Sequence, residues 1–470
     1  MPKFELLING ELVTGDAKMD VVNPATEEVF AQCSRASEAQ LNATVSAARA
    51  AFQKWQKTGI QERRVLLAKV ADILEANATE LASILTQEQG KPLQSARSEI
   101  QSTADFFRYF ANLDLPVEVL EDSAERRVEA HRTPLGVVAA IVPWNVPMVL
   151  MAFKVPAALL AGNTIIVKPA PTTPLTTLRF GELIKDVFPP GVINIITDGN
   201  DLGPLLTTHP DIAKISFTGS TETGSRVMAG AARQIKRLTL ELGGNDAGII
   251  LDDVDSTTIA PKVYAAAFGN SGQICIAIKR LYVHESKYDE FVEELAKVNS
   301  NTVVGNGLEA DTTMGPLQNK AQFEKVKELL ADAKLHGTVV TGGIIPDGPG
   351  YFIAPTIFRD IDEDSRLVRE EQFGPLLPVL KFSDEEEAIE RANDCDYGLG
   401  GSIWSSDLAR AKRLAEKLEA GTVWINQHTG LDKRYPFAGM KRSGFGTELG
   451  QAGLEEFTQR KIISIPSGFA

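Results

Sequence analysis

The sequence predicts an α/β protein in which mainly parallel sheets are covered by helices on both faces. First, from residue 136 onward, short apolar strands alternate with helix-like stretches, which is the pattern of such sheets. Second, 470 residues exceed the size at which one hydrophobic core stops growing, so two or more domains are expected. Third, 43% hydrophobic and 23% charged residues are the usage of an ordinary globular protein and exclude a disordered or fibrous chain.

The N-terminal quarter is predicted to form a hairpin followed by helices. Two alternating runs flank Asn9-Gly10, and this dipeptide is the strongest short hairpin signal. From about residue 38 to residue 112, apolar residues recur at three- and four-residue spacing, as they do on one face of a helix. Gly90 and Pro92, within EQGKP, are typical of a helix end.

Extended segments and alternating strands make up the rest of the chain. The stretch VEVLEDSAERRVEAHRTPLG is interpreted as a pair of extended segments. Strands are predicted at GVVAAIV, NTIIVKP, NIIT, KISFTG, AGIIL, LYV, LLPVLKF, GTVWIN and FTQRKIISI, and helices at SKYDEFVEELAKV and KAQFEKVKELLADAKLHG. Because the sequence contains no repeat and no Pro/Ser-rich linker, we expect the domains to share an extensive interface.

Composition limits the partners and the compartment. A net charge of −14 and a pI near 5.1 make the average surface repel nucleic acid and anionic membranes. The three cysteines, Cys33, Cys275 and Cys395, form no CxxC pair, which argues against a disulfide scaffold or a metal site and favours a reducing compartment. The N-terminal stretch lacks the features of a signal peptide, and apolar runs are broken before about 18 residues, so a cytoplasmic protein is expected.

A thiol and a carboxylate are the first candidates for chemistry. Cys275 lies in FGNSGQICIAIKR, where an apolar run is typical of a buried, inert thiol, yet Gly272 and the polar lead-in are typical of a ligand-facing loop. Glu241 ends an apolar strand directly before Gly243-Gly244. Partial burial there would raise its pKa toward that of a general base, whereas a solvated strand-end glutamate would have no such role.

Three further polar features follow predicted strands. Asn145, in the turn VPWNVP, has a side-chain amide that could donate to an oxyanion or could satisfy its own turn. The segment FTGSTETG, with Gly219, Ser220 and Gly224, matches neither the Rossmann fingerprint nor a P-loop, but a glycine turn that opens a helix presents free amides to a phosphate. Lys168 ends the strand NTIIVK, at the edge where doubly wound sheets bind ligands.

Seven motifs together resemble the NAD(P)-dependent aldehyde dehydrogenase superfamily, in the same order and at about the same spacing. They are PWN at 143–145, KP at 168–169, FTGSTETG at 217–224, LELGG at 240–244, GQICIA around Cys275, EEQFGP at 370–375 and PFAGMKRSG at 436–444. The resemblance covers essentially the whole chain.

The resemblance implies the catalytic roles. Cys275 would be the nucleophile that attacks the aldehyde, with the Asn145 side chain and the Cys275 backbone amide holding the oxyanion. Glu241 would activate the water that hydrolyses the resulting thioester, and no metal is implied. Since Ile274 and Ile276 flank Cys275, the second cysteine that some members carry beside the nucleophile is missing, and we expect Cys275 to act alone.

The resemblance also implies a bound NAD or NADP. Its contacts would come from Trp144, Lys168, Gly219, Ser220, Gly224, Glu371 and Phe373, with Lys168 at the adenosine ribose and Glu371 and Phe373 at the nicotinamide. Pro171 stands where many NAD-preferring members have a glutamate that repels the 2′-phosphate of NADP. The sequence nevertheless favours NAD, because no arginine occurs in the stretch before Arg179.

The implied architecture has three parts. A Rossmann-type cofactor-binding domain would comprise 1–111 and 133–243, to which 445–457 returns, and an α/β catalytic domain would comprise 244–444. A small β oligomerisation element would comprise 112–132 and 458–470. We therefore expect a homodimer or a homotetramer.

The predicted function is hydrolytic oxidation of an aldehyde. Phe106, Phe107, Tyr109 and Phe110 would form an aromatic wall of the substrate tunnel and favour aryl or medium-chain aldehydes. A semialdehyde dehydrogenase is the alternative, if Arg108, Lys433 or Arg434 reaches the tunnel. Three further alternatives are less favoured. Glu241 argues against a CoA-acylating relative, and the complete catalytic set argues against an inactive structural homologue. The lack of a histidine motif argues against a thiol hydrolase.

Overall fold

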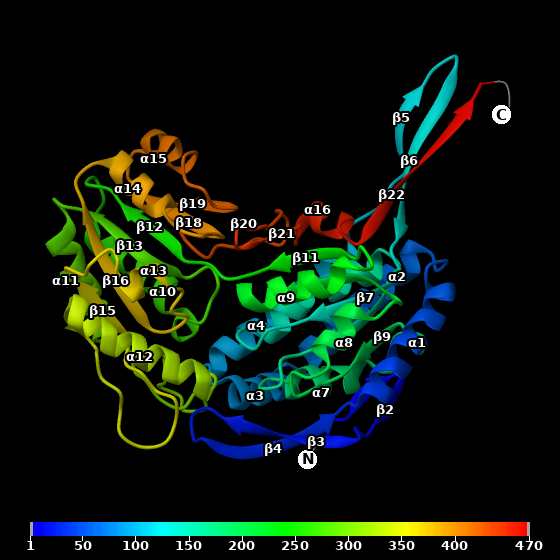
Figure 1. Ribbon diagram of the computed structural model, residues 1–470, viewed down its shortest axis with the longest axis horizontal. Coiled ribbons are helices and arrows are strands. Elements are labelled where there is room, and N and C mark those ends of the chain that lie inside the picture. Colours follow the sequence, from blue (N-terminus) through cyan, green and yellow to red (C-terminus); the bar gives the residue numbers. More distant parts are fainter. Residues whose placement is uncertain (1–2, 468–470) are drawn as a thin grey trace.

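The computed structural model describes residues 3–467, and two large sheets dominate it (Figure 1). The first sheet has the strand order β2 (Glu11–Val13), β1 (Leu6–Ile8), β9 (Ile193–Ile195), β8 (Thr164–Lys168), β7 (Val137–Ile141), β10 (Ile212–Thr218), β11 (Arg237–Glu241) and β21 (Gly444–Phe445). The strands from β9 to β11 are parallel, and β1, β2 and β21 extend the sheet by antiparallel pairing. The predicted α/β fold is confirmed.

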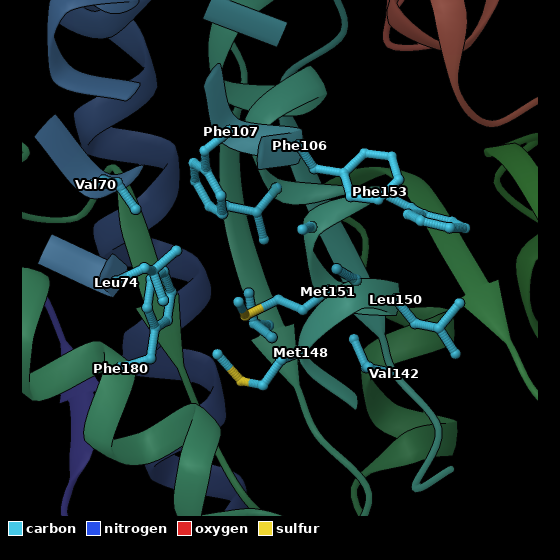
Figure 2. Packing of buried hydrophobic residues seen from close by; sticks show 14 of the residues in the cluster. Val70, Leu74, Phe106, Phe107, Val142, Met148, Leu150, Met151, Phe153 and Phe180 are labelled. Atoms are coloured by element: carbon cyan, nitrogen blue, oxygen red, sulfur yellow. The ribbon is translucent and has the colours of Figure 1, made fainter. Parts of the chain in front are cut away.

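Alternate residues of this sheet enter two different cores. Val138 and Ala140 face a cluster formed with α2 (Ile60–Ala76), α3 (Ala78–Gln89), α4 (Leu93–Ala111), α5 (Pro147–Ala152), α6 (Val155–Leu160) and α7 (Leu175–Ile184). Figure 2 shows part of this cluster, with side chains of α2, α4 and α5 converging. Val137 and Ala139 face the other cluster, formed with α1 (Glu38–Trp55), α8 (Gly203–Thr208) and α9 (Thr221–Ala232). Helices therefore cover both faces, as predicted.

In chain order, the second sheet starts at Asp246, a few residues after β11 of the first sheet ends at Glu241. Its order is β14 (Thr338–Thr341), β15 (Thr356–Arg359), β16 (Leu376–Phe382), β13 (Ile278–His284), β12 (Asp246–Ile250), β18 (Gly400–Trp404) and β19 (Thr422–Ile425). One face packs on α10 (Ser256–Phe268) and α11 (Tyr288–Asn299), and the other on α12 (Lys320–His336), α13 (Arg366–Arg369), α14 (Glu385–Asn393) and α15 (Leu408–Ala415). The domain limits stay a prediction, but the sheets do change between Glu241 and Asp246.

A small sheet projects from the body at one end (Figure 1). It consists of β22 (Thr458–Pro466), β6 (Arg126–Pro134) and β5 (Glu118–Asp122), with α16 (Gly450–Glu455) leading into β22. Val119, Leu120 and Ile462 are exposed on it. This sheet corresponds to the predicted oligomerisation element, of which 468–470 lie outside the described residues.

Local signals explain several of these elements. Asn9 and Gly10 both have positive φ in the turn between β1 and β2, which confirms the hairpin, and Gly90 at φ 95° ends α3 as predicted. The sequence analysis did not predict the hairpin of β3 (Ala17–Asn23) and β4 (Glu28–Arg35), nor the short pair β17 (Tyr397–Gly398) and β20 (Met440–Lys441). Among residues 3–467, no helix has the length and apolar character needed to cross a membrane.

Candidate active site

Cys275 lies in the loop between the 3₁₀ turn Gly269–Gly272 and strand β13. Gly272 has φ 73°, and a Cβ on it would clash with the backbone carbonyl of Gly374. Only glycine allows this approach, which holds the Cys275 loop against the segment that carries Glu371 and Phe373. The sequence therefore places the thiol beside the two residues predicted to contact the nicotinamide.

A cavity of about 200 Å³ brings most of the predicted catalytic residues together. Its lining residues include Trp144, Asn145, Leu150, Gly219, Ser220, Leu242, Cys275, Gln322, Lys325, Glu371 and Phe373. We call it the thiol cavity. Glu241 is not among the residues that line it.

Asn145 is held from both its side chain and its backbone. Its Nδ2 donates to the carbonyl of Gln273, 2.9 Å away. Its own carbonyl accepts from Asn270 Nδ2 at 3.0 Å and from Lys91 Nζ at 3.1 Å. A primary amide has two N–H groups, so the second can donate to a ligand in the thiol cavity.

The surroundings of the Cys275 thiol favour its protonated form. Burial raises the pKa of Cys275 to about 12, and the nearby carboxyls of Asp246, Glu371 and Glu241 act in the same direction. At neutral pH the thiol of the free protein is therefore neutral, and thiolate formation needs a change in the local charge.

Glu241 is the last residue of β11 and directly precedes Leu242 and Gly243, which line the thiol cavity. It is 3% exposed, and neither of its oxygens has a hydrogen-bond partner within residues 3–467. Burial raises the pKa of Glu241 well above the ordinary carboxyl value, Glu448 raises it further, and Lys154 opposes both. This carboxyl therefore retains its proton to a higher pH than a solvated glutamate does.

Lys154 and Glu448 form a buried ion pair behind Glu241, which the sequence analysis missed. Lys154 Nζ donates to Glu448 and, at 2.8 Å, to the Thr218 hydroxyl. Ser216 Oγ donates to the same Glu448 oxygen over 3.2 Å. A lysine inside the apolar stretch MAFKVPAALL was the signal that could have identified this pair, since an unpaired ammonium is rarely buried.

A second cavity, of about 790 Å³, lies at the carboxyl ends of β7, β8 and β10. We call it the nucleotide cavity; it shares Pro143, Trp144, Thr218, Gly219 and Ser220 with the thiol cavity. Its walls and the start of α9, where Ser220 Oγ accepts from Thr223 N, fit a dinucleotide whose phosphates face helix amides. Gly224 does not line this cavity: a Cβ there would clash with Leu242, so packing explains this glycine.

Lys168 lines the nucleotide cavity as predicted, but its charge is already paired. Its Nζ lies 2.6 Å from Oδ1 of Asp198, and both side chains are buried. The other oxygen of Asp198 accepts from the Leu202 amide at 3.0 Å. The sequence analysis did not identify Asp198, which lies 30 residues further along the chain.

Glu371 and Phe373 close the thiol cavity from the second sheet. Glu371 Oε1 accepts from the Gly244 amide at 3.0 Å, and burial raises the pKa of this carboxyl. Phe373 has φ 48°, and its ring meets the Trp144 ring edge-on at 5.4 Å between centroids. The Lys279 ammonium lies 5.2 Å from the same ring, and burial lowers the pKa of Lys279 to about 8.

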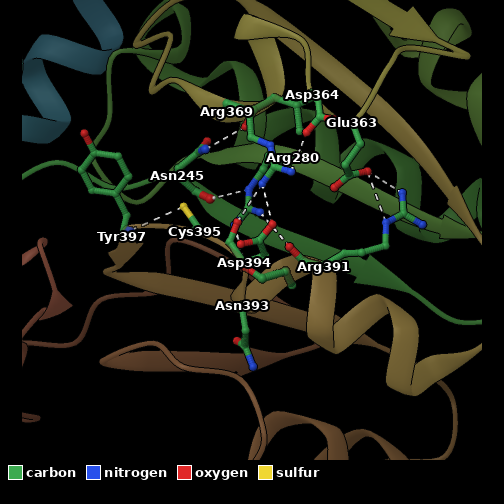
Figure 3. A network of polar contacts seen from close by, with 12 residues as sticks. Asn245, Arg280, Glu363, Asp364, Arg369, Arg391, Asn393, Asp394, Cys395 and Tyr397 are labelled. Atoms are coloured by element: carbon green, nitrogen blue, oxygen red, sulfur yellow. Dashed lines mark hydrogen bonds and ion pairs between the residues drawn. The ribbon is translucent and has the colours of Figure 1, made fainter.

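A network of arginine contacts supports the strand that follows Cys275. Figure 3 shows Arg280 of β13 together with Asn245, Arg391, Asp394 and neighbouring residues. Arg280 donates to the carbonyls of Asn245 and Ala392, each at 2.9 Å. These bonds tie β13 to the start of β12 and to the end of α14, so the base of the Cys275 loop is fixed.

None of the four residues predicted to form an aromatic wall, Phe106, Phe107, Tyr109 and Phe110, lines the thiol cavity. Phe107 and Phe110 are fully buried in the core, where the Phe107 ring packs 6.0 Å from that of Phe180. Phe106 packs against Phe153, at 4.8 Å between centroids (Figure 2). Helix periodicity turns these side chains inward, and Leu150 lines the thiol cavity instead.

Comparisons with known proteins agree with this fold and site. The sequence model of the aldehyde dehydrogenase family matches residues 12–463. A mitochondrial aldehyde dehydrogenase of Leishmania tarentolae is 41% identical, covering 98% of this chain and 95% of its own length. The phenylacetaldehyde dehydrogenase of Pseudomonas fluorescens is 39% identical over the same shares of the two chains.

Solved structures extend the likeness. A betaine aldehyde dehydrogenase from Staphylococcus aureus, in complex with NAD+, superposes with a TM-score of 0.95 at 34% identity and covers 100% of this chain and 95% of that one. An Escherichia coli NADP-dependent enzyme has a TM-score of 0.96 at 36% identity, covering 99% and 98%. The chain belongs to the aldehyde dehydrogenase family and is an NAD(P)-dependent oxidoreductase that acts on aldehydes.

Proposed function

We propose that this protein oxidises an aryl or medium-chain aldehyde to the carboxylic acid through a thioester on Cys275. One observation carries the proposal: Cys275, the Asn145 amide, Glu371 and Phe373 line one small cavity that shares five residues with the nucleotide cavity. The aldehyde, the thiol and the cofactor can therefore meet at one point.

In the first step the Cys275 S–H bond breaks, its proton passes to solvent water, and the sulfur forms a bond to the aldehyde carbon. The carbonyl oxygen becomes an oxyanion, which the free N–H of Asn145 and the Cys275 amide stabilise. Because the pKa of this thiol is about 12, the step requires a nearby positive charge or a proton acceptor. When bound, the oxidised nicotinamide supplies that charge and accepts the hydride released from the adduct.

In the second step water hydrolyses the thioester and restores the thiol. Glu241 takes a proton from the water, since burial and the Glu448 charge raise the pKa of its carboxyl toward that of a general base. The charges of the Lys154–Glu448 pair act on the Glu241 carboxyl in opposite directions. A hydrolytic base of this kind argues against a CoA-acylating enzyme.

The three cations near the predicted tunnel are each paired with a carboxylate of the protein, which supports an uncharged substrate. Arg108 is bonded to Glu75 and Asp72, Arg434 is bonded to Asp432, and Lys433 lies 3.8 Å from Asp105. None of these three cations lines the thiol cavity. Lys325 does line it, and donates to the Glu371 carbonyl at 2.7 Å. The likeness to a phenylacetaldehyde dehydrogenase also supports an aryl substrate.

We also propose that NAD is preferred to NADP. Because Asp198 already neutralises the Lys168 ammonium, the adenosine ribose would meet no unpaired cation from that strand end. Arg226 lines the same cavity but is bonded to Glu222. We expect Asp198→Asn to tighten NADP binding at least about tenfold relative to NAD, measured by fluorescence titration. Unchanged relative affinities would contradict this explanation of the preference.

The small sheet supports a proposed homo-oligomer. Its exposed Val119, Leu120 and Ile462 would be covered by a second copy. Light scattering should then give a mass of two or four chains. The domain limits and the cytoplasmic location stay predictions.

The experiment that tests the function is a panel of aryl, aliphatic and carboxylated aldehydes, assayed with each cofactor, with and without CoA. We expect reduction of NAD, the highest kcat/KM with aryl or medium-chain aldehydes, and no requirement for CoA. The highest kcat/KM with a carboxylated aldehyde would favour the semialdehyde alternative.

A further inference from the structure

We propose that the buried ion pair of Lys91 and Glu99 is a positioning element for Asn145. It holds the turn from which the Asn145 amide reaches the reacting oxygen. This inference rests on the oxyanion role proposed for Asn145. It states that Lys91 and Glu99, which do not line the thiol cavity, affect the rate of the first chemical step.

The pair contacts both ends of the turn. The side chains of Lys91 and Glu99 are only 4% and 3% exposed. Lys91 Nζ donates to Glu99 Oε2 and to the Asn145 carbonyl, the latter at 3.1 Å. Glu99 Oε1 accepts from the Met148 amide at 2.9 Å. The ion pair therefore holds the backbone of residues 145–148 by hydrogen bonds at both ends, at the Asn145 carbonyl and at the Met148 amide.

The backbone that carries Lys91 is itself fixed. Gly90 has φ 95°, and the link from α3 to α4 packs against a loop of the second sheet. A Cβ on Gly307 would clash with the Lys91 carbonyl, and the Leu93 amide donates to the Gly307 carbonyl at 2.8 Å. These contacts fix the backbone of Lys91, from which a buried side chain carries the ammonium to the Asn145 carbonyl.

The loop 270–275, which carries Cys275 and which we call the nucleophile loop, also binds the Asn145 carbonyl. Asn270 Nδ2 donates to the Asn145 carbonyl at 3.0 Å, while Asn145 Nδ2 donates to Gln273 at 2.9 Å. Without Lys91, this carbonyl would keep one of its two donors. The turn would then be able to pivot about the nucleophile loop, which would move the amide relative to Cys275.

Stability alone is a weak explanation for such a pair. Moving two charges out of water costs about as much as their attraction returns, and apolar residues of equal size often stabilise a core as well. Placement of a hydrogen-bond donor, in contrast, is demanding, because a displacement of about 1 Å can lower a rate about 100-fold. The contacts to Asn145 and Met148 favour this second role.

A double-mutant cycle tests the inference. Lys91→Met/Glu99→Gln removes both charges without leaving one unpaired in the core, and it would be combined with Asn145→Ala. Lys91→Arg keeps the charge and serves as the conservative variant. Lys214→Met is the matched control, since Lys214 is also fully buried but donates to Thr239 on β11, away from Asn145. The readouts are the rate of the first hydride release, KM for the aldehyde and the Kd of NAD.

We expect Lys91→Met/Glu99→Gln to slow hydride release about 10- to 100-fold in the natural background and less than about twofold in the Asn145→Ala background. KM and the Kd of NAD should change less than about twofold, and Lys91→Arg should retain most of the rate. Lys214→Met should have the same effect in both backgrounds.

Two results would overturn the inference, and they are distinguishable. An equal loss in both backgrounds would show that the pair acts elsewhere, and would leave the proposed function intact. Full activity of Asn145→Ala alone would remove the oxyanion role of Asn145 and with it the inference, whereas full aldehyde oxidation by Cys275→Ala would remove the proposed function. If the double charge variant does not fold, Lys91→Gln, which removes the ammonium and keeps a polar side chain beside Glu99, decides the question: a loss of about 10-fold that disappears in the Asn145→Ala background supports the inference, and no loss, or a loss that persists there, overturns it.

Discussion

Two of the groups predicted to act with Cys275, Asn145 and Glu241, are built in opposite ways. Asn145 is fixed by hydrogen bonds to its side chain and its carbonyl, three in all among the described residues. Glu241 has no hydrogen-bond partner on either oxygen within residues 3–467 and lies beside a second carboxyl, that of Glu448. A donor that must meet an oxyanion gains from fixed geometry, whereas a base that must take up and release a proton gains from a raised pKa.

The comparison assigns the two groups to different steps. Asn145 should act before the hydride is released, and Glu241 after it. Variants of the two residues should therefore differ in the step that they slow as well as in overall rate.

The largest effect is expected for Glu241→Gln. Removing the base should lower steady-state turnover about 10²- to 10⁴-fold, because the thioester would wait for unassisted hydrolysis. The first turnover should remain fast, so rapid mixing should show a burst of about one cofactor reduced per active site. Loss of the burst would place Glu241 in the first step instead.

Asn145→Ala should have the next largest effect. Loss of one oxyanion donor lowers rates about 10²- to 10³-fold, and here the loss should fall on the first turnover. The same rapid-mixing measurement should then show slow single-phase reduction without a burst. A retained burst would break the contrast between the two residues.

The thiol itself should titrate at unusually high pH. Since the pKa of Cys275 is raised to about 12, its alkylation by iodoacetamide in the free protein should rise about tenfold per pH unit up to that value. Peptide mass spectrometry separates Cys275 from Cys33 and Cys395. Added NAD+ should accelerate the labelling at neutral pH, and a plateau near pH 8 without cofactor would contradict the burial argument.

The smallest effect concerns stability. The folded pKa of Glu241 is raised, so its contribution to stability is complete below about pH 4.3, the unfolded value, and is lost as pH rises toward the folded value. Glu241→Gln removes that dependence. Thermal melts from about pH 5 to about pH 9 should show a shallower fall in Tm for the variant than for the natural protein. Parallel curves would contradict the assignment.

Local sequence patterns predicted the secondary-structure elements better than they predicted the long-range contacts. The Asn9-Gly10 hairpin and the Gly90 helix end follow from backbone preferences of single residues, which a sequence displays directly. The β3–β4 hairpin was missed: its sequence contains Asn23-Pro24 but no strong alternation, and tertiary packing of Val21 and Cys33 decides it.

The site shows the same limit. Motifs identified Trp144, Asn145, Cys275, Glu371 and Phe373, which line the thiol cavity, but not its further lining residues Leu150, Gln322 and Lys325. The pairs Lys91–Glu99, Lys154–Glu448 and Lys168–Asp198 were not identified, although each is buried. In the last two pairs the partners are far apart in the sequence, and Lys91 lies 54 residues from Asn145, so only the folded chain brings these charges together.

The central claim is that the substrate carbon becomes bonded to Cys275. The most direct measurement is intact-protein and peptide mass spectrometry of Glu241→Gln, quenched in acid after one turnover with NAD and a preferred aldehyde. We predict one acyl group on the peptide that contains Cys275, and none when Cys275→Ala is added. Absence of the acyl group after a full burst of cofactor reduction, or undiminished oxidation by Cys275→Ala alone, would contradict the account.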